Sequence, residues 1–140
     1  MTNTLNNNKT MTKKEERDLI YNKFDGRCAY CGCKLQKGWH IDELLPVRRN
    51  MKWNKDKTKF VHDGTYVHPE RLHYKNQMPS CPSCNINKHS MELEDFRKLI
   101  SGFMKHLNEI STQYKIAKRY GLVQETLKPI VFYFEIFKQQ

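Results

Sequence analysis

Four cysteines stand in two Cys-x-x-Cys pairs, Cys28 with Cys31 and Cys81 with Cys84. Two thiolates two residues apart can bind one side of a tetrahedral ion, and a second pair completes a closed coordination shell. Four soft sulfur ligands favour zinc or iron, and zinc is expected where nothing indicates redox chemistry. We therefore predict a structural zinc site at these residues. Disulfides are the alternative, and Cys33 is expected to be a bystander.

Polar residues lie at fixed places between and after these pairs. Ile41-Asp42-Glu43-Leu44-Leu45-Pro46 follows the first pair, Asn76-x-Met78-Pro79 precedes the second, and Asn85-x-x-Lys88 comes directly after it. This order resembles the HNH endonuclease family, whose pattern reads C-x-x-C, hydrophobic-Asp-His-hydrophobic-x-Pro, then Asn-hydrophobic-x-x-x-Cys-x-x-Cys-Asn-x-x-Lys. The resemblance covers residues 24–90, and the C-terminal part is similar to that of phage and bacterial members.

The resemblance implies a ββα-metal fold that hydrolyses phosphodiester bonds of DNA, with double-stranded DNA as the expected partner. By position, Asp42 and Asn85 would bind a catalytic Mg²⁺ or Mn²⁺, a hard cation with oxygen ligands. Asn76 would brace the loop that carries the base, and Lys88 would lie near the nucleic-acid backbone. Taken singly, each residue has a plainer interpretation, since Asp and Asn often serve as cap or turn residues.

The chain departs from the family pattern at Glu43, which stands where the family has its catalytic histidine. A carboxylate is a weaker base than imidazole, and Glu43 places a second negative charge beside Asp42. His40 is the nearest histidine, although the alternation of a strand would put it on the face of Asp42 and opposite Glu43. Two hypotheses follow: an endonuclease that uses Glu43 as a variant base, or a zinc-stabilised nucleic-acid-binding or inhibitory protein that no longer cuts.

The charge of the chain favours a polyanionic partner. Lysine and arginine outnumber aspartate and glutamate by 25 to 15, which gives a formal charge of +10. Such an excess attracts nucleic acid, although a generally basic soluble protein would show it too. Between Lys34 and Lys59 the basic residues are interleaved with Trp39 and Trp53. We expect nucleic acid to bind at Arg48, Arg49, Lys52 and Lys88.

The elements that must position these residues follow from local patterns. A capping box at Thr12-x-x-Glu15 predicts a helix that ends at Gly26. Residues 39–45 predict a strand closed by Pro46, and Asp63-Gly64 predicts a tight hairpin turn. Hydrophobic residues at helical spacing predict a helix over 91–107, and a second is expected over 112–120. The closing stretch 129–137 predicts a strand or an apolar docking segment.

We therefore expect an α+β protein: a ββα-metal module around a four-cysteine zinc site, with an N-terminal helix and a C-terminal helical extension. Residues 1–11 are expected to form a disordered tail, 12–90 the nuclease domain, and 91–140 an extension packed on the same domain. The polar N-terminus resembles neither a signal peptide nor a membrane anchor, so a cytoplasmic protein is expected.

Overall fold

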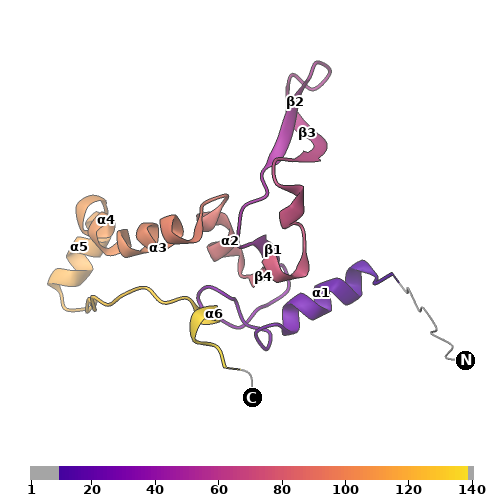
Figure 1. Cartoon of the computed structure of the whole chain (residues 1–140). Helices are drawn as coiled ribbons and strands as arrows, with labels where there is room; N and C mark the ends of the chain where they lie inside the picture. Colours follow the sequence, from indigo (N-terminus) through magenta and orange to yellow (C-terminus); the bar gives the residue numbers. More distant parts are fainter. Residues whose placement is uncertain (1–9, 139–140) are drawn as a thin grey trace, which may run out of the picture.

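The computed structural model describes residues 10–138, so most of the predicted tail lies outside the described residues. Within them the chain is a mixed α+β protein with two small antiparallel sheets and six α-helices (Figure 1). No helix in this part of the chain has the length and apolar character that crossing a bilayer requires.

The first sheet joins two segments that are far apart in the sequence. Strand β1 (His40–Glu43) pairs antiparallel with β4 (Gln77–Ser80), with Asp42 opposite Met78 and Glu43 opposite Gln77. Helix α2 (Pro82–Lys88) begins directly after β4 and contacts β1. Strand β1 is shorter than the predicted 39–45 by one residue at its start and two at its end, the usual uncertainty of element boundaries.

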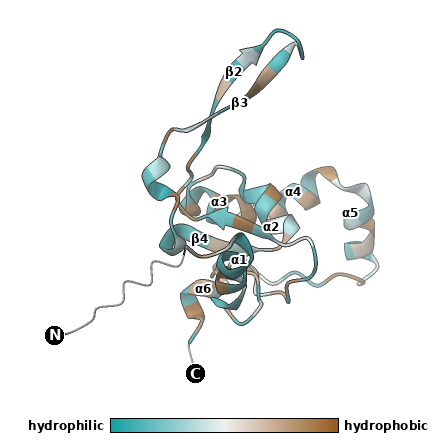
Figure 2. Cartoon of the chain, turned by 90° about the vertical axis from the view of Figure 1, so that its right-hand side faces the viewer, coloured by the Kyte–Doolittle hydropathy of each residue, from teal (hydrophilic) through white to brown (hydrophobic). Residues whose placement is uncertain are grey.

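The second sheet is a two-stranded arm that projects away from the rest of the molecule (Figures 1 and 2). It pairs β2 (Arg49–Asn54) with β3 (Lys59–Tyr66), and residues 55–58 form its turn. The prediction of a turn at Asp63-Gly64 was wrong. Both residues lie inside β3, where the Asp63 carboxylate accepts hydrogen bonds from the amide and hydroxyl of Thr65. They form a bulge that shifts the strand register, a second common use of Asp-Gly.

The N-terminal helix α1 (Lys13–Asn22) begins as predicted. The Thr12 amide donates to the Glu15 carboxylate at 2.7 Å, and the Glu15 amide donates to the Thr12 hydroxyl at 3.2 Å, which confirms the capping box. Gly26 follows with φ +74°, and a Cβ there would lie 2.7 Å from the Tyr21 hydroxyl oxygen. Only glycine allows the chain to turn this closely into the first cysteine pair.

Two short 3₁₀ helices, η1 (Pro69–Arg71) and η2 (Tyr74–Asn76), connect the arm to β4. Beyond α2 the chain forms α3 (Leu93–Ser101), α4 (Phe103–Ile110) and α5 (Thr112–Arg119). The single helix predicted over 91–107 is therefore divided at Gly102, whereas the helix predicted over 112–120 is confirmed. Gly102 serves both as the last cap of α3 and as the first cap of α4.

The closing segment docks on the first cysteine pair and is not a strand. It forms the short helix α6 (Tyr133–Ile136). The amide of Tyr133 donates to the carbonyl of Tyr30 at 2.9 Å, and that of Phe134 donates to Ala29 at 2.8 Å. Phe132 is buried and stacks on Phe96, with ring centroids 5.5 Å apart.

The core is therefore built around the first cysteine pair. Its buried members come from the segment after α1, from β4, from α3 and from the closing segment. They are Phe24, Cys28, Ala29, Tyr30, Leu35, Met78, Phe96 and Phe132. Residues on both sides of position 90 thus share one core, which holds the cysteine pairs and β1 in place.

Candidate metal centre and the carboxylates beside it

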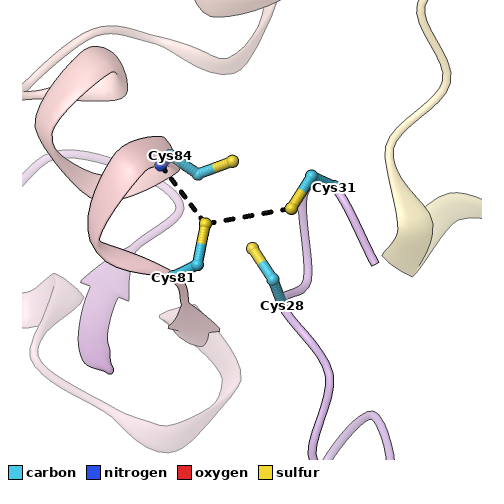
Figure 3. Close-up of side chains that lie close together, drawn as sticks. All are labelled: Cys28, Cys31, Cys81 and Cys84. Carbon is cyan, nitrogen blue, oxygen red and sulfur yellow. Dashed lines mark hydrogen bonds between the residues drawn. The ribbon is translucent and has the colours of Figure 1, made fainter. Parts of the chain in front are cut away.

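Four cysteines come together in a cluster that could hold a metal ion such as zinc. The Sγ atoms of Cys28, Cys31, Cys81 and Cys84 all lie within 4.8 Å of one another (Figure 3). The sulfurs of Cys31 and Cys81 are 3.8 Å apart. A tetrahedral zinc with Zn–S bonds of ~2.3 Å requires sulfur–sulfur edges of about 3.8 Å, so the cluster has the size of a zinc site.

Backbone geometry shapes the first pair. The Cys28 amide donates to the Cys33 carbonyl at 2.9 Å, and the Gly32 amide donates to the Cys28 carbonyl at 2.9 Å. Gly32 has φ +75°, and a Cβ there would come within 2.9 Å of the Tyr133 ring. The closing segment therefore packs directly against this turn, which keeps both cysteine side chains directed at the second pair.

The second pair is shaped by the start of α2. Cys81 caps this helix, and its sulfur accepts a hydrogen bond from the Cys84 amide at 3.4 Å (Figure 3). Pro82 occupies the first turn, where its missing N–H costs nothing. The Cys-Pro-x-Cys sequence thus begins a helix and places two sulfurs on one side of it.

The crowding of the thiols sets their protonation. A hydrogen bond from Cys84 lowers the pKa of Cys28 to about 4, and that same bond raises the pKa of Cys84. Burial raises the pKa of Cys31 to about 12. One thiolate therefore suppresses ionisation of its neighbours, and a bound cation would have to displace the remaining protons. All five cysteines are free of disulfides, and Cys33 lies outside the cluster, as predicted for a bystander.

Asp42 lies buried between the first cysteine pair and α2. Its Oδ2 accepts a hydrogen bond from the Tyr30 hydroxyl and lies 3.0 Å from the Lys88 ammonium nitrogen. Lys88 is wholly inaccessible to solvent and also donates to the Glu43 carbonyl at 3.0 Å. The expectation that Lys88 lies at a nucleic-acid backbone is therefore wrong for this structure, because its charge is used inside the protein to neutralise Asp42.

Glu43 follows Asp42 on β1 and is half-buried. Burial raises the pKa of its carboxyl, and the negative charge of Asp42 raises it further. The positive charges of Lys88 and Arg49 lower this pKa, but they do not outweigh the burial. A carboxyl whose pKa is raised toward neutral pH is a better proton acceptor than an exposed glutamate.

Asn76 fixes the chain directly after Glu43. Its side-chain oxygen accepts from the Leu45 amide at 2.7 Å, and its side-chain nitrogen donates to the carbonyls of Leu45 and Arg71, each at 2.9 Å. Its own carbonyl accepts from the Leu44 amide at 2.8 Å. Asn76 therefore fixes the backbone of Leu44 and Leu45 and links it to Arg71.

The other residues expected at the site are distributed differently. Asn85 is half-buried and lies one turn before Lys88, so both residues share the helix face that contacts β1. His40 is exposed at the start of β1. Arg48 and Arg49 are exposed at the root of the arm, and Lys52 is exposed farther along β2. The structure thus gathers Asp42, Glu43, Asn76 and Lys88 around one junction, with Asn85 one turn earlier on α2, and leaves the basic residues of the arm outside it.

Tyr30 is the site residue that the sequence did not reveal. It stands between the two cysteines of the first pair, and its hydroxyl reaches across to Asp42. Its position inside Cys-Ala-Tyr-Cys gave no sign of that contact, because the partner belongs to another element. Tyr30 therefore links the cysteine cluster physically to the carboxylate on β1.

Comparison with known proteins matched this chain to no protein-family model, no curated protein and no solved structure. The interpretation of the site therefore depends on its own geometry and chemistry.

Proposed function

We propose that the protein is a metal-dependent endonuclease that hydrolyses phosphodiester bonds of DNA, built on an HNH-type ββα-metal module. The observation that supports this most is the pairing of Asp42 and Glu43 on β1 with α2 packed against them. One of these adjacent carboxylates is buried and the other half-buried, and carboxyl groups in such surroundings cluster at functional sites. A zinc ion at the four cysteines would hold β4, α2 and the first cysteine pair around these two carboxylates.

Asp42 and Asn85 are the residues that would hold the catalytic cation. The hydrogen bond from Tyr30 and the ion pair with Lys88 both use Oδ2 of Asp42. Among the described residues Oδ1 accepts no hydrogen bond, so Oδ1 is the oxygen available for a cation. The half-buried amide of Asn85 offers a second hard oxygen on the facing helix. Mg²⁺ or Mn²⁺ at these oxygens would polarise the scissile phosphate and stabilise the departing 3′ oxygen.

Glu43 is the group proposed to take the proton of the attacking water. Its carboxylate is ionised above its own pKa, and the raised pKa makes it a better proton acceptor than an exposed glutamate. Asn76 holds Leu44 and Leu45, which follow Glu43, by three hydrogen bonds, and this limits the freedom of Glu43. Tyr30 and Lys88 act as positioning residues, because each contacts Asp42 from inside the protein.

The Lys88–Asp42 ion pair supports a second candidate function. An ammonium group already neutralises the carboxylate that a catalytic cation needs. A protein that binds nucleic acid on this scaffold without cutting it would gain from that pair, because a buried aspartate needs a partner even where no cation binds. The basic exterior is common to both candidates.

A plasmid-nicking assay with Mg²⁺ or Mn²⁺ separates the two. The variants are Asp42→Ala, Glu43→Gln and Glu43→His, with the exposed pair Asp18→Ala and Glu16→Gln as matched controls on α1. For an endonuclease, wild type cuts, Glu43→Gln loses about 10²–10⁴-fold in rate and the controls do not change. An inert wild type that still binds DNA, together with cutting by Glu43→His, would establish the second candidate.

A further inference from the structure

The β2–β3 arm has two chemically distinct faces. Residues directly opposite each other in an antiparallel pair place their side chains on the same face, and successive residues alternate. Trp53 lies opposite Phe60, and Met51 lies opposite His62, so these four share one face. Lys52 lies opposite Val61, and Asn54 opposite Lys59, on the other. One face is therefore aromatic and the other carries basic side chains.

The aromatic face is open to solvent. Trp53 and Phe60 keep 53% and 63% of their surface exposed although they pack edge to face, with ring centroids 5.2 Å apart. No residue of either described strand is buried. Two large aromatic side chains on a segment that projects from the body are not part of the core, and such exposed patches commonly mark binding sites.

The charge on the arm indicates what would bind there. The stretch from Arg49 to Phe60 carries five basic residues, Arg49, Lys52, Lys55, Lys57 and Lys59, against Asp56 alone. A protein partner would more commonly meet an interface depleted in lysine. The lysines of the turn and of the opposite face flank these exposed rings on a ribbon that is only two strands wide. This arrangement matches a nucleic-acid strand, in which each phosphate is accompanied by a base that can stack.

The root of the arm is fixed to the candidate site. The amide of Val67 donates to the Arg48 carbonyl at 3.0 Å, and that of His68 donates to Val47 at 3.1 Å, which extends the pairing beyond the named strands. The Arg71 guanidinium donates to the Pro46 carbonyl at 2.7 Å. Pro46 lies three residues after Glu43, so a nucleic-acid strand bound to the arm would be held next to β1. The arm itself spans about 20 Å for the six residues of β2.

We propose that the β2–β3 arm is a nucleic-acid-binding element in which lysines contact phosphates while Trp53 and Phe60 stack on bases. The identity of the ligand rests on the proposed function, but binding by the arm is separate from cutting at Glu43. Loss of cutting in Asp42→Ala with intact binding tests the site, whereas loss of binding in the arm variants tests the arm.

The test is a fluorescence-anisotropy titration of the zinc-loaded full chain with no Mg²⁺ or Mn²⁺ added. The ligands are a labelled DNA single strand, its duplex, and heparin, which is a polyanion without bases. Trp53→Phe keeps a flat ring and Trp53→Leu keeps only apolar bulk. Tyr120→Ala, at the C-terminal cap of α5, is the control for an exposed aromatic residue outside the arm. Lys52→Gln/Lys59→Gln is compared with Lys13→Gln/Lys14→Gln, which removes the same charge from α1.

Trp53→Leu should bind DNA about tenfold more weakly than wild type and bind heparin equally well, whereas Trp53→Phe and Tyr120→Ala bind both as wild type does. The Lys52/Lys59 double variant should bind both DNA and heparin more weakly than wild type. It should also reduce the slope of log K against log salt by about 1.4 to 1.8. The Lys13/Lys14 variant should leave that slope unchanged. The tighter of the two DNA ligands identifies whether bases are read from a single strand or within a duplex.

Fluorescence gives an independent readout. In a Trp39→Phe background Trp53 is the only tryptophan, and DNA should quench its emission whereas heparin should not. The proposal is overturned if the arm variants bind DNA like their matched controls, or if Trp53 emission does not respond to DNA. Either result would leave the aromatic face to a protein partner.

Discussion

The ammonium nitrogen of Lys88 lies 3.0 Å from Oδ2 of Asp42, and neither side chain has appreciable contact with solvent. The pair joins α2 to β1 directly behind the candidate site, and Tyr30 donates to the same oxygen. A buried pair of this kind contributes little net stability compared with apolar residues, but its removal on one side leaves an uncompensated charge. The role of this ion pair is to hold Asp42 and Glu43 in position, because Lys88 also donates to the Glu43 carbonyl.

Lys88→Met should therefore lower the free energy of unfolding by about 3–5 kcal/mol, because Asp42 loses its partner inside the protein. Adding Asp42→Asn should recover part of this loss, since the buried charge is then gone. Lys98→Met on the exposed side of α3 is the control and should change stability by less than about 0.5 kcal/mol. Urea denaturation with an unchanged m-value measures all three. Equal effects of Lys88→Met and Lys98→Met would contradict the burial of the pair.

Zinc binding should be inseparable from folding. The purified protein is expected to contain one zinc per chain, released by a thiol-modifying reagent, and chelation should abolish the cooperative thermal transition because the cluster lies beside the core. Cys84→Ser should lose the metal. Cys33→Ser should keep both metal and transition, since Cys33 lies outside the cluster. Retention of a full equivalent of zinc by Cys84→Ser would exclude this ligand set.

Asn76→Ala should cost about 1–3 kcal/mol of stability, because it leaves the amide and carbonyl of Leu45 without their partners. Asn87→Ala is the matched control, since within residues 10–138 the one hydrogen bond of its side chain is an exposed one to the Ser83 carbonyl in α2. If the protein cuts DNA, Asn76→Ala should also reduce the rate in Mg²⁺ more than its loss of stability explains. An Asn76→Ala variant with unchanged stability and activity would show that the hydrogen bonds of Asn76 to Leu45 contribute to neither.

Local features of this fold could be predicted from the sequence. Each Cys-x-x-Cys pair lies within four residues, so the spacing alone indicates that its two sulfurs can bind one ion. The Thr12 capping box likewise involves residues only three positions apart. The hairpin turn was misplaced because Asp-Gly suits a bulge as well as a turn, and the structure uses it inside β3. The hydrophobic period continues from α3 into α4, so it concealed the break at Gly102.

Contacts between distant segments could not be predicted. Lys88 has the sequence context of an exposed lysine, and its burial depends on Asp42 from another element. The Tyr30 hydroxyl and the docking of Phe132 depend in the same way on packing that no local pattern encodes. Local sequence therefore predicted the cysteine cluster, but neither the Lys88–Asp42 ion pair nor the contact of Tyr30 with Asp42.

The docking of the closing segment should depend on pH through Glu135. The Arg97 guanidinium donates to the Glu135 carboxylate and to the Ile130 carbonyl, which connects α3 to this segment. Its hydrogen bond lowers the pKa of Glu135 below the usual 4.5. A lowered folded pKa means that the stabilisation is fully present above pH 4.5 and is lost as the pH falls through the lower value.

Glu135→Gln should therefore lower stability at pH 7 by about 0.5–1 kcal/mol, a value reduced by the partial exposure of the pair. The difference from wild type should shrink as the pH falls below 4.5 and vanish once the carboxylate is protonated in both states. Glu109→Gln, which breaks an exposed pair with Lys105, is the control and should show little effect. Thermal denaturation across this pH range measures the difference. A stability gap that persists at the lowest pH would show that Glu135 acts through packing and not through its charge.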